Sequence, residues 1–212
     1  MVATGGELPR HAGSIAVRNG HHHILEWLRS RHYPLDKNRV CTEAAVGGHL
    51  NSLQWARANG GAWNISICRD AVGAGAFGLV QWARRNGCPW DESTCTNAAT
   101  TGNLHILRWA RAQGCPWDST TCSEAARQGH FEVLKWARRS GCPWDEDTCA
   151  GAASAKRLDM LQWARAEGCP WDYRTYASAE WAANGVMITW LKLNGCARKA
   201  PVGGVSQEDL YV

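Results

Sequence analysis

The stretch that decides the fold is TTCSEAARQGHFEVLKWARRSGCPWDE, residues 120–146. It holds two segments with helix-forming composition, one before Gly129 and one that ends at Gly141. Glycine commonly ends a helix because it adopts the left-handed conformation without strain. In the second segment the apolar residues Val133, Trp136 and Ala137 recur at spacings of three and four, which place them on one buried face. The stretch therefore predicts two short helices, over about 121–128 and 130–140.

This unit recurs along most of the chain, and tryptophan marks its period. One tryptophan series has a first gap of 28 residues and later gaps of 27: Trp27, Trp55, Trp82, Trp109, Trp136, Trp163 and Trp190. A second series follows eight residues behind: Trp63, Trp90, Trp117, Trp144 and Trp171. All ten cysteines keep the same period, in two series: Cys41, Cys68, Cys95, Cys122 and Cys149, then Cys88, Cys115, Cys142, Cys169 and Cys196. Self-similarity at a fixed period is typical of a repeat architecture.

Such short helices need neighbours. A helix of two to three turns is marginal alone in water, and one pair cannot bury its own apolar face. Stacking successive pairs solves this, so we expect an all-α solenoid of about seven stacked helix-turn-helix repeats over residues 13–196. Residues 1–12 would form a lead-in. Residues 197–212 lose the period, which predicts a disordered C-terminal tail.

The repeat resembles the ankyrin repeat. AARQGHFEVLK, residues 125–135, is similar to that family's AAxxGHxEVVK core, and GCPWDE stands where the family usually has GADVNA. The chain looks most like the short ankyrin-type repeats with a WAR…GCPWD signature found in large families of algae, oomycetes and giant viruses. The resemblance implies stacked helix pairs, a role in protein–protein interaction, and first helices that line the concave face.

The chain also departs from the ankyrin pattern. Its repeat has 27 residues where a standard unit has 33, and the missing residues fall where a projecting β-hairpin would lie. We therefore expect abbreviated hairpins. The glycine that ends the first helix becomes Lys156 and then Ala183 in the last two repeats. Asn184 is a candidate for the left-handed residue of the last repeat.

Each GCPWD turn also offers a start for the next helix. Asp91 is a candidate N-cap, because an aspartate oxygen can accept the free N–H groups of a first turn. Ser93, which aligns with the threonine that opens the ankyrin repeat, is the competing cap.

The cysteines invite a redox or metal interpretation, which their spacing does not favour. Zinc ligands usually come in close pairs, whereas Cys88 and Cys95 have six residues between them. Equivalent cysteines in adjacent repeats would lie about 10 Å apart, beyond reach of a disulfide. We therefore interpret them as small buried apolar side chains. No phosphate loop, nucleophile elbow or carboxylate pair is present, so we expect no metal, no cofactor and no enzyme activity.

One arginine follows each WA pair and suggests an alternative function. The row consists of Arg57, Arg84, Arg111, Arg138 and Arg165. Stacked cations could bind a nucleic acid or another polyanion. A rival interpretation pairs them with the aspartates seven residues on, such as Asp91 and Asp118. The net charge of +4 favours that pairing over nucleic-acid binding.

Variable positions on the first helices are the better candidates for recognition of a protein partner. They vary from repeat to repeat while the neighbouring cysteine and alanine positions stay the same. Drift on a solvated surface would give the same variation. The candidates are Glu43, Arg69, Asp70, Thr96, Asn97, Ser123 and Glu124.

The N-terminal segment has no apolar run of signal-peptide type. The longest apolar stretch, residues 71–80, is too short to span a bilayer. We expect a soluble, monomeric protein of the cytoplasm or nucleus that binds an unidentified protein and no membrane.

Overall fold

The computed structural model describes residues 12–199, which form fourteen α-helices and no strand. Six-residue connections such as 140–145 replace projecting hairpins. The predicted all-α architecture of about seven helix pairs is therefore correct. The predicted disordered tail lies outside the described residues from position 200 onward. The chain divides into two compact units, residues 1–94 and 95–212.

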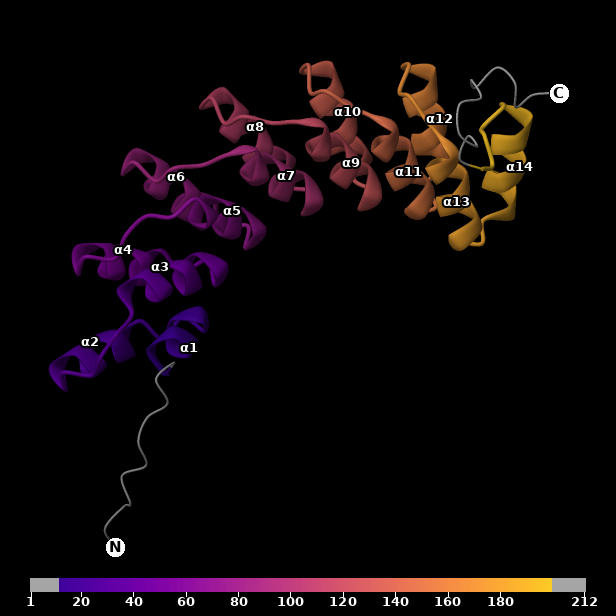
Figure 1. Cartoon of the computed structure of the whole chain (residues 1–212). Coiled ribbons are helices and arrows are strands. Elements are labelled where there is room, and N and C mark those ends of the chain that lie inside the picture. Colours follow the sequence, from indigo (N-terminus) through magenta and orange to yellow (C-terminus); the bar gives the residue numbers. More distant parts are fainter. Residues whose placement is uncertain (1–11, 200–212) are drawn as a thin grey trace, which may run out of the picture. The chain divides into compact units, whose positions relative to one another are not determined.

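The first unit contains three helix pairs (Figure 1). Its first helices α1, α3 and α5 pack side by side, and each contacts the second helix that follows it. The bounds are α1 Ala12–Arg18, α2 His23–Ser30, α3 Lys37–Val46, α4 Leu50–Ala58, α5 Ser66–Gly73 and α6 Phe77–Arg85. Val17, Leu25, Leu53 and Ile67 are among its fully buried side chains.

The second unit repeats this arrangement. Helix α7, Glu92–Thr100, is divided between the units, and α8 to α14 lie wholly in the second. Figure 1 shows α9, α11 and α13 side by side along one edge of this unit. The bounds are α8 Leu104–Ala112, α9 Ser119–Arg127, α10 Phe131–Arg139, α11 Glu146–Ser154, α12 Leu158–Ala166, α13 Tyr173–Trp181 and α14 Gly185–Leu193.

Small side chains let the first helices of the second unit approach closely. Ala125, Ala126, Ala152 and Ala153 are fully buried. Gly151 lies so near α9 that an added Cβ would stand 2.8 Å from the Ser123 carbonyl oxygen. The alanine-rich first helices therefore form the tight seam along which the repeats stack.

The turn inside each helix pair takes one left-handed residue at a fixed place. Gly48, Gly75, Gly102 and Gly129 have positive φ, and so do Lys156 (φ 59°) and Ala183 (φ 51°). The prediction for Asn184 is wrong, because its φ is −94°. Its side chain instead accepts a hydrogen bond from the Met187 backbone N–H and caps α14. The turn geometry is imposed by its place in the repeat even where no glycine is present.

The aspartate of the GCPWD turn caps the helix that follows it. Asp118, Asp145 and Asp172 accept from the backbone N–H two residues on. Asp91 does the same toward Ser93 at 3.1 Å, and the Ser93 hydroxyl donates to that aspartate. Asp91 is thus the cap and Ser93 its partner. Because the cap precedes the helix directly, α9 begins two residues earlier than predicted.

Candidate partner-binding surfaces

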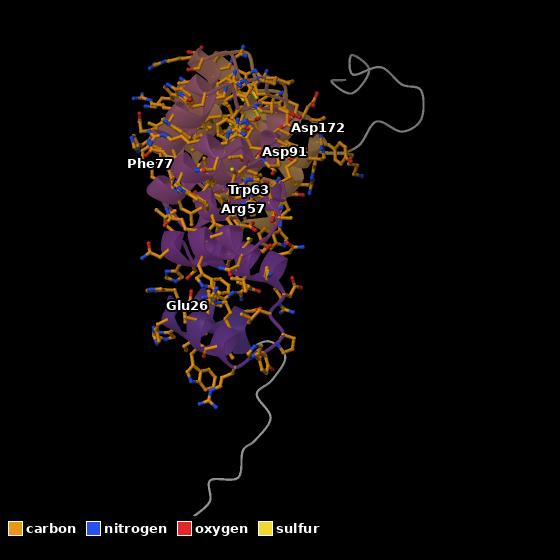
Figure 2. The ribbon with its side chains drawn as sticks, turned by 90° about the vertical axis from the view of Figure 1, so that its left-hand side faces the viewer. Glu26, Arg57, Trp63, Phe77, Asp91 and Asp172 are labelled. Atoms are coloured by element: carbon orange, nitrogen blue, oxygen red, sulfur yellow. The ribbon has the colours of Figure 1, made fainter. Side chains whose placement is uncertain are left out.

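The arginine row lies against the tryptophans of the turns. Each guanidinium carbon sits about 4 Å from an indole centroid, inside the range of a cation–π contact. The pairs are Arg57–Trp63 at 4.2 Å, Arg84–Trp90 at 3.9 Å, Arg111–Trp117 at 4.1 Å, Arg138–Trp144 at 4.2 Å and Arg165–Trp171 at 4.1 Å. Figure 2 labels the first of these pairs. Each arginine therefore fastens its helix to the turn that follows.

Most of these arginines make a second contact within the same turn. Arg57, Arg84, Arg111 and Arg165 each donate to the backbone carbonyl four residues further on. These carbonyls belong to Gly61, Cys88, Cys115 and Cys169. The contacts that hold these arginines are therefore an indole and a backbone carbonyl of the turn, while turn aspartates such as Asp118 cap the helices that follow.

The same tryptophans join one repeat to the next. Trp117 meets Trp136 of the following helix pair with ring centroids 5.8 Å apart and planes inclined at 61°. Trp63–Trp82, Trp144–Trp163 and Trp171–Trp190 have centroid separations of 5.7, 5.9 and 5.8 Å. Such tilted or edge-to-face pairs are favourable aromatic geometry. Arginine, turn tryptophan and helix tryptophan thus form a repeated clamp.

The candidate positions on the first helices are mostly half-buried, and most make polar contacts. Glu43 pairs with Arg18 at 2.6 Å, Arg69 with Asp70 at 2.8 Å, and Glu124 with Arg127 at 3.1 Å. The Thr96 and Thr120 hydroxyls are 2.8 Å apart, and Asn97 is half-buried. Ser123 differs from the others, because it is only 5% exposed in the α9–α11 seam. Its place in the seam removes it from any accessible face.

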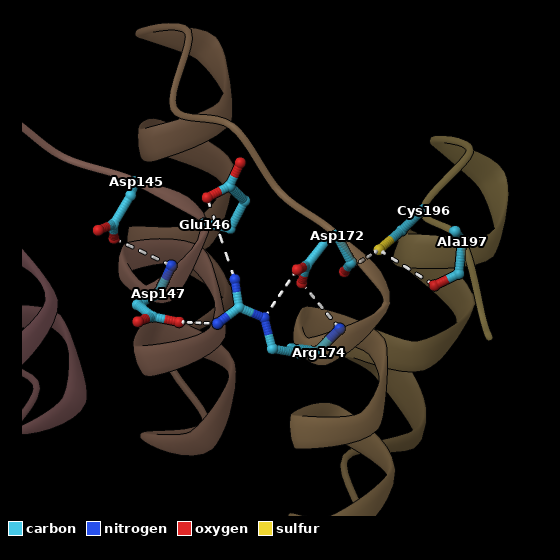
Figure 3. A network of polar contacts seen from close by, with 7 residues as sticks. All are labelled: Asp145, Glu146, Asp147, Asp172, Arg174, Cys196 and Ala197. Atoms are coloured by element: carbon cyan, nitrogen blue, oxygen red, sulfur yellow. Dashed lines mark hydrogen bonds and ion pairs between the residues drawn. The ribbon is translucent and has the colours of Figure 1, made fainter. Parts of the chain in front are cut away.

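Sequence reasoning missed a polar network at the start of α13 (Figure 3). Arg174 reaches Asp172, the cap of its own helix, at 2.7 Å, and Asp147 at 2.5 Å and Glu146 at 4.0 Å on α11. The signal was available, because the residue 27 positions earlier is the aspartate that Arg174 meets. Charge complementarity between equivalent positions of adjacent repeats would have predicted the contact.

All ten cysteines are buried and free, as the apolar interpretation requires. The Cys142 thiol donates to the Asp118 carbonyl at 3.3 Å, and Cys169 and Cys196 make the equivalent contact one and two repeats later. Within a repeat the two cysteine series meet: a hydrogen bond with the Cys142 thiol, and then burial, raise the pKa of the Cys122 thiol. The spacing of equivalent cysteines in adjacent repeats concerns one series only, so it did not predict this contact between the two series.

Burial makes the thiols of Cys41 and Cys196 poorly suited to metal or nucleophile chemistry, whereas a hydrogen bond with Cys88 lowers the pKa of the Cys68 thiol. Burial raises the pKa of Cys41 to about 11. A thiol with a raised pKa is neither a good ligand nor a good nucleophile at neutral pH. Between residues 12 and 199, no three histidine, cysteine, aspartate or glutamate side chains are grouped so that they could hold a metal ion.

Two histidines join neighbouring repeats. His49 Nε2 lies 3.1 Å from the Arg18 carbonyl, and His130 Nε2 lies 3.1 Å from that of Thr100. Arg157, at the position equivalent to His130, donates to the carbonyl of Gly129 at 2.9 Å, in the turn that follows α9. The carbonyls near the two histidines belong to the last residues of α1 and α7, where intrahelical partners run out.

The comparisons with known proteins concern the fold. No protein-family model and no curated protein matches the sequence. Among solved structures, the human ASB11 ankyrin repeat domain matches with a TM-score of 0.64 and 15% identity, over 90% of this chain and 99% of that one.

The fold is an ankyrin-repeat solenoid.

At 15% identity, the likeness establishes the architecture but does not identify the binding residues of this chain. The ankyrin-repeat helices are also short, and no helix within residues 12–199 is long and apolar enough to cross a membrane.

Proposed function

We propose that this chain is a non-catalytic scaffold or adaptor that binds a protein partner through its first helices. The observation that carries the proposal is the division of labour inside the repeat. The turns and second helices supply the Arg–Trp clamp, whereas Glu43, Asp70, Asn97 and Glu124 vary on a regular frame. Variable side chains on a rigid scaffold are typical of a recognition surface.

The likeness to short ankyrin-type repeats with the WAR…GCPWD signature supports the same proposal. This resemblance depends on the residues of the turn, and it does not identify the binding partner. We place the protein inside the cell, because ten buried free thiols suit a reducing compartment.

Polyanion binding along the second helices is the second candidate. The observation in its favour is the charge of α8, α10, α12 and α14, which carry seven arginine and lysine residues against two carboxylates. Against it, Arg111, Arg138 and Arg165 already lie on tryptophans and would have to leave them.

Photo-crosslinking from one position on each row of helices separates the two candidates. A photoreactive residue replaces Asn97 on a first helix in one variant and exposed Gln113, just after a second helix, in the other. We expect position 97 to capture a discrete protein in cells of the source organism and position 113 not to. Capture from position 113 alone, or of nucleic acid from it, would contradict the proposal.

A further inference from the structure

Trp181 stands outside the repeat pattern. The chain has 13 tryptophans, twelve of which belong to the two periodic series. Trp181 is the remaining tryptophan. It ends α13, the first helix of the last repeat, and it is 86% exposed. The two preceding repeats carry Ser154 and Arg127 at this position. The repeat does not require an aromatic residue here, and an exposed tryptophan costs solubility, so its presence points to a binding role.

The first helices around Trp181 are strongly acidic. In the second unit, α9, α11, α13 and their aspartate caps carry seven carboxylates against two arginines. The acids are Asp118, Glu124, Asp145, Glu146, Asp147, Asp172 and Glu180. The two arginines, Arg127 and Arg174, are each already paired with acids of this set. Glu180 pairs with Arg198 after α14, so the unpaired acids lie toward the starts of the helices. The second helices of the same unit have the opposite balance, so charge is segregated between the two rows of helices.

Trp181 and the acidic network share one side of α13. Arg174 and Trp181 are seven residues apart, which places them on the same side of a helix and about 10 Å apart along its axis. Arg174 marks the position of Glu146, Asp147 and Asp172, which it contacts (Figure 3). An exposed aromatic surface and a cluster of excess carboxylates therefore lie within reach of one short peptide.

We propose that this surface binds a basic segment of a protein partner, with Trp181 as its anchor. A lysine or arginine of the segment packs its methylene groups and its charge on the indole. A second cation about 10 Å away, roughly three residues along an extended chain, meets the carboxylates around Arg174. Tryptophan is strongly enriched among the hot-spot residues that contribute most of the binding energy of an interface. The inference rests on the proposed first-helix function and names the chemistry of its partner.

The test uses two labelled twelve-residue peptides, one a fourfold repeat of Lys-Arg-Ser and the other of Glu-Glu-Ser, with binding to the full chain followed by fluorescence anisotropy. Trp181→Ser restores the residue of the preceding repeat. Val186→Ser is the matched control, because Val186 is also exposed (72%) but lies on the second helix α14. We expect the basic peptide alone to bind, Trp181→Ser to weaken it about tenfold or more, and the control to change it less than about twofold.

A second variant, Glu146→Gln with Asp147→Asn, should weaken binding and reduce its dependence on salt. No binding of the basic peptide below about 1 mM, or equal binding by the wild type and Trp181→Ser, would overturn the inference. If position 97 still captures a protein while Trp181→Ser changes nothing, the proposed function stands and only the anchor fails. If Trp181 binds the basic peptide and position 97 captures nothing, the wider first-helix surface fails.

Discussion

At the scale of single residues, shape decides more than polarity. Thr94, Thr121, Thr148 and Thr175 are fully buried, and their hydroxyls make no hydrogen bond in the described structure. The equivalent residues of the two earlier repeats are Val40 and Ile67. A β-branched side chain occupies this position in each of these repeats, and the hydroxyl of the threonines contributes no hydrogen bond.

Gly151 shows the same rule at the α9–α11 seam. A Cβ there would meet two backbone atoms of α9, the Ser123 oxygen at 2.8 Å and the Arg127 nitrogen at 3.0 Å, which cannot move independently of the helix. We expect Gly151→Ala to lower the free energy of unfolding by about 1–2 kcal/mol, because overpacking costs more than the gain in helix propensity. Denaturant unfolding measures this change.

Gly185 is the matched control for that substitution. It opens α14 in the same unit, and a Cβ there would meet nothing within 4 Å. Gly185→Ala should leave stability unchanged or raise it slightly. If both alanine variants unfold alike, the close seam between α9 and α11 is wrong.

At the scale of helices and turns, the residues that commonly begin and end helices predict much of the structure. Gly129 and Gly141 lie two residues after the last residues of α9 and α10, and of the two candidate caps that the sequence offers, Asp91 and Ser93, the structure has Asp91. The turn at Ala183 was not predicted, because residue preference favours Asn184 for the left-handed place. Stacking of the last repeat overrides that preference by about 1–2 kcal/mol of local strain.

Lys156 carries the same strain in the turn before. It adopts φ 59°, where the equivalent residues Gly102 and Gly129 have 72° and 75°. We expect Lys156→Gly to stabilise the chain by up to about 1 kcal/mol, since relief of strain exceeds the extra freedom of glycine in the unfolded chain. Thermal unfolding checks this, with Lys156→Ala as the control that removes the same charge but keeps the Cβ. Equal melting temperatures for the two variants would show that the turn is not strained.

At the scale of the whole molecule, the repeat period alone predicts the helix pairs, their number and the burial of every cysteine. It does not predict how charges pair, because two interactions at the same spacing compete. The arginine and aspartate rows are seven residues apart in sequence, yet each guanidinium finds a tryptophan six residues on. Nor does the period rank candidate surface residues: Ser123 is variable like its neighbours but is buried by the seam.

The central claim is that the arginine row holds the repeats together and leaves recognition to the first helices. Two double variants test it, because exposed arginines directly follow two clamp arginines. Arg84→Gln with Arg138→Gln removes two guanidiniums from Trp90 and Trp144, whereas Arg85→Gln with Arg139→Gln removes the same charge from exposed positions.

The decisive measurement is the free energy of unfolding of these two variants, with retention on immobilised heparin recorded on the same samples. We predict that the clamp variant loses about 1–2 kcal/mol and the control less than about 0.5 kcal/mol, while heparin retention falls equally in both. Equal stability in the two variants, together with a selective loss of heparin retention by the clamp variant, would contradict the claim and identify the row as a polyanion site.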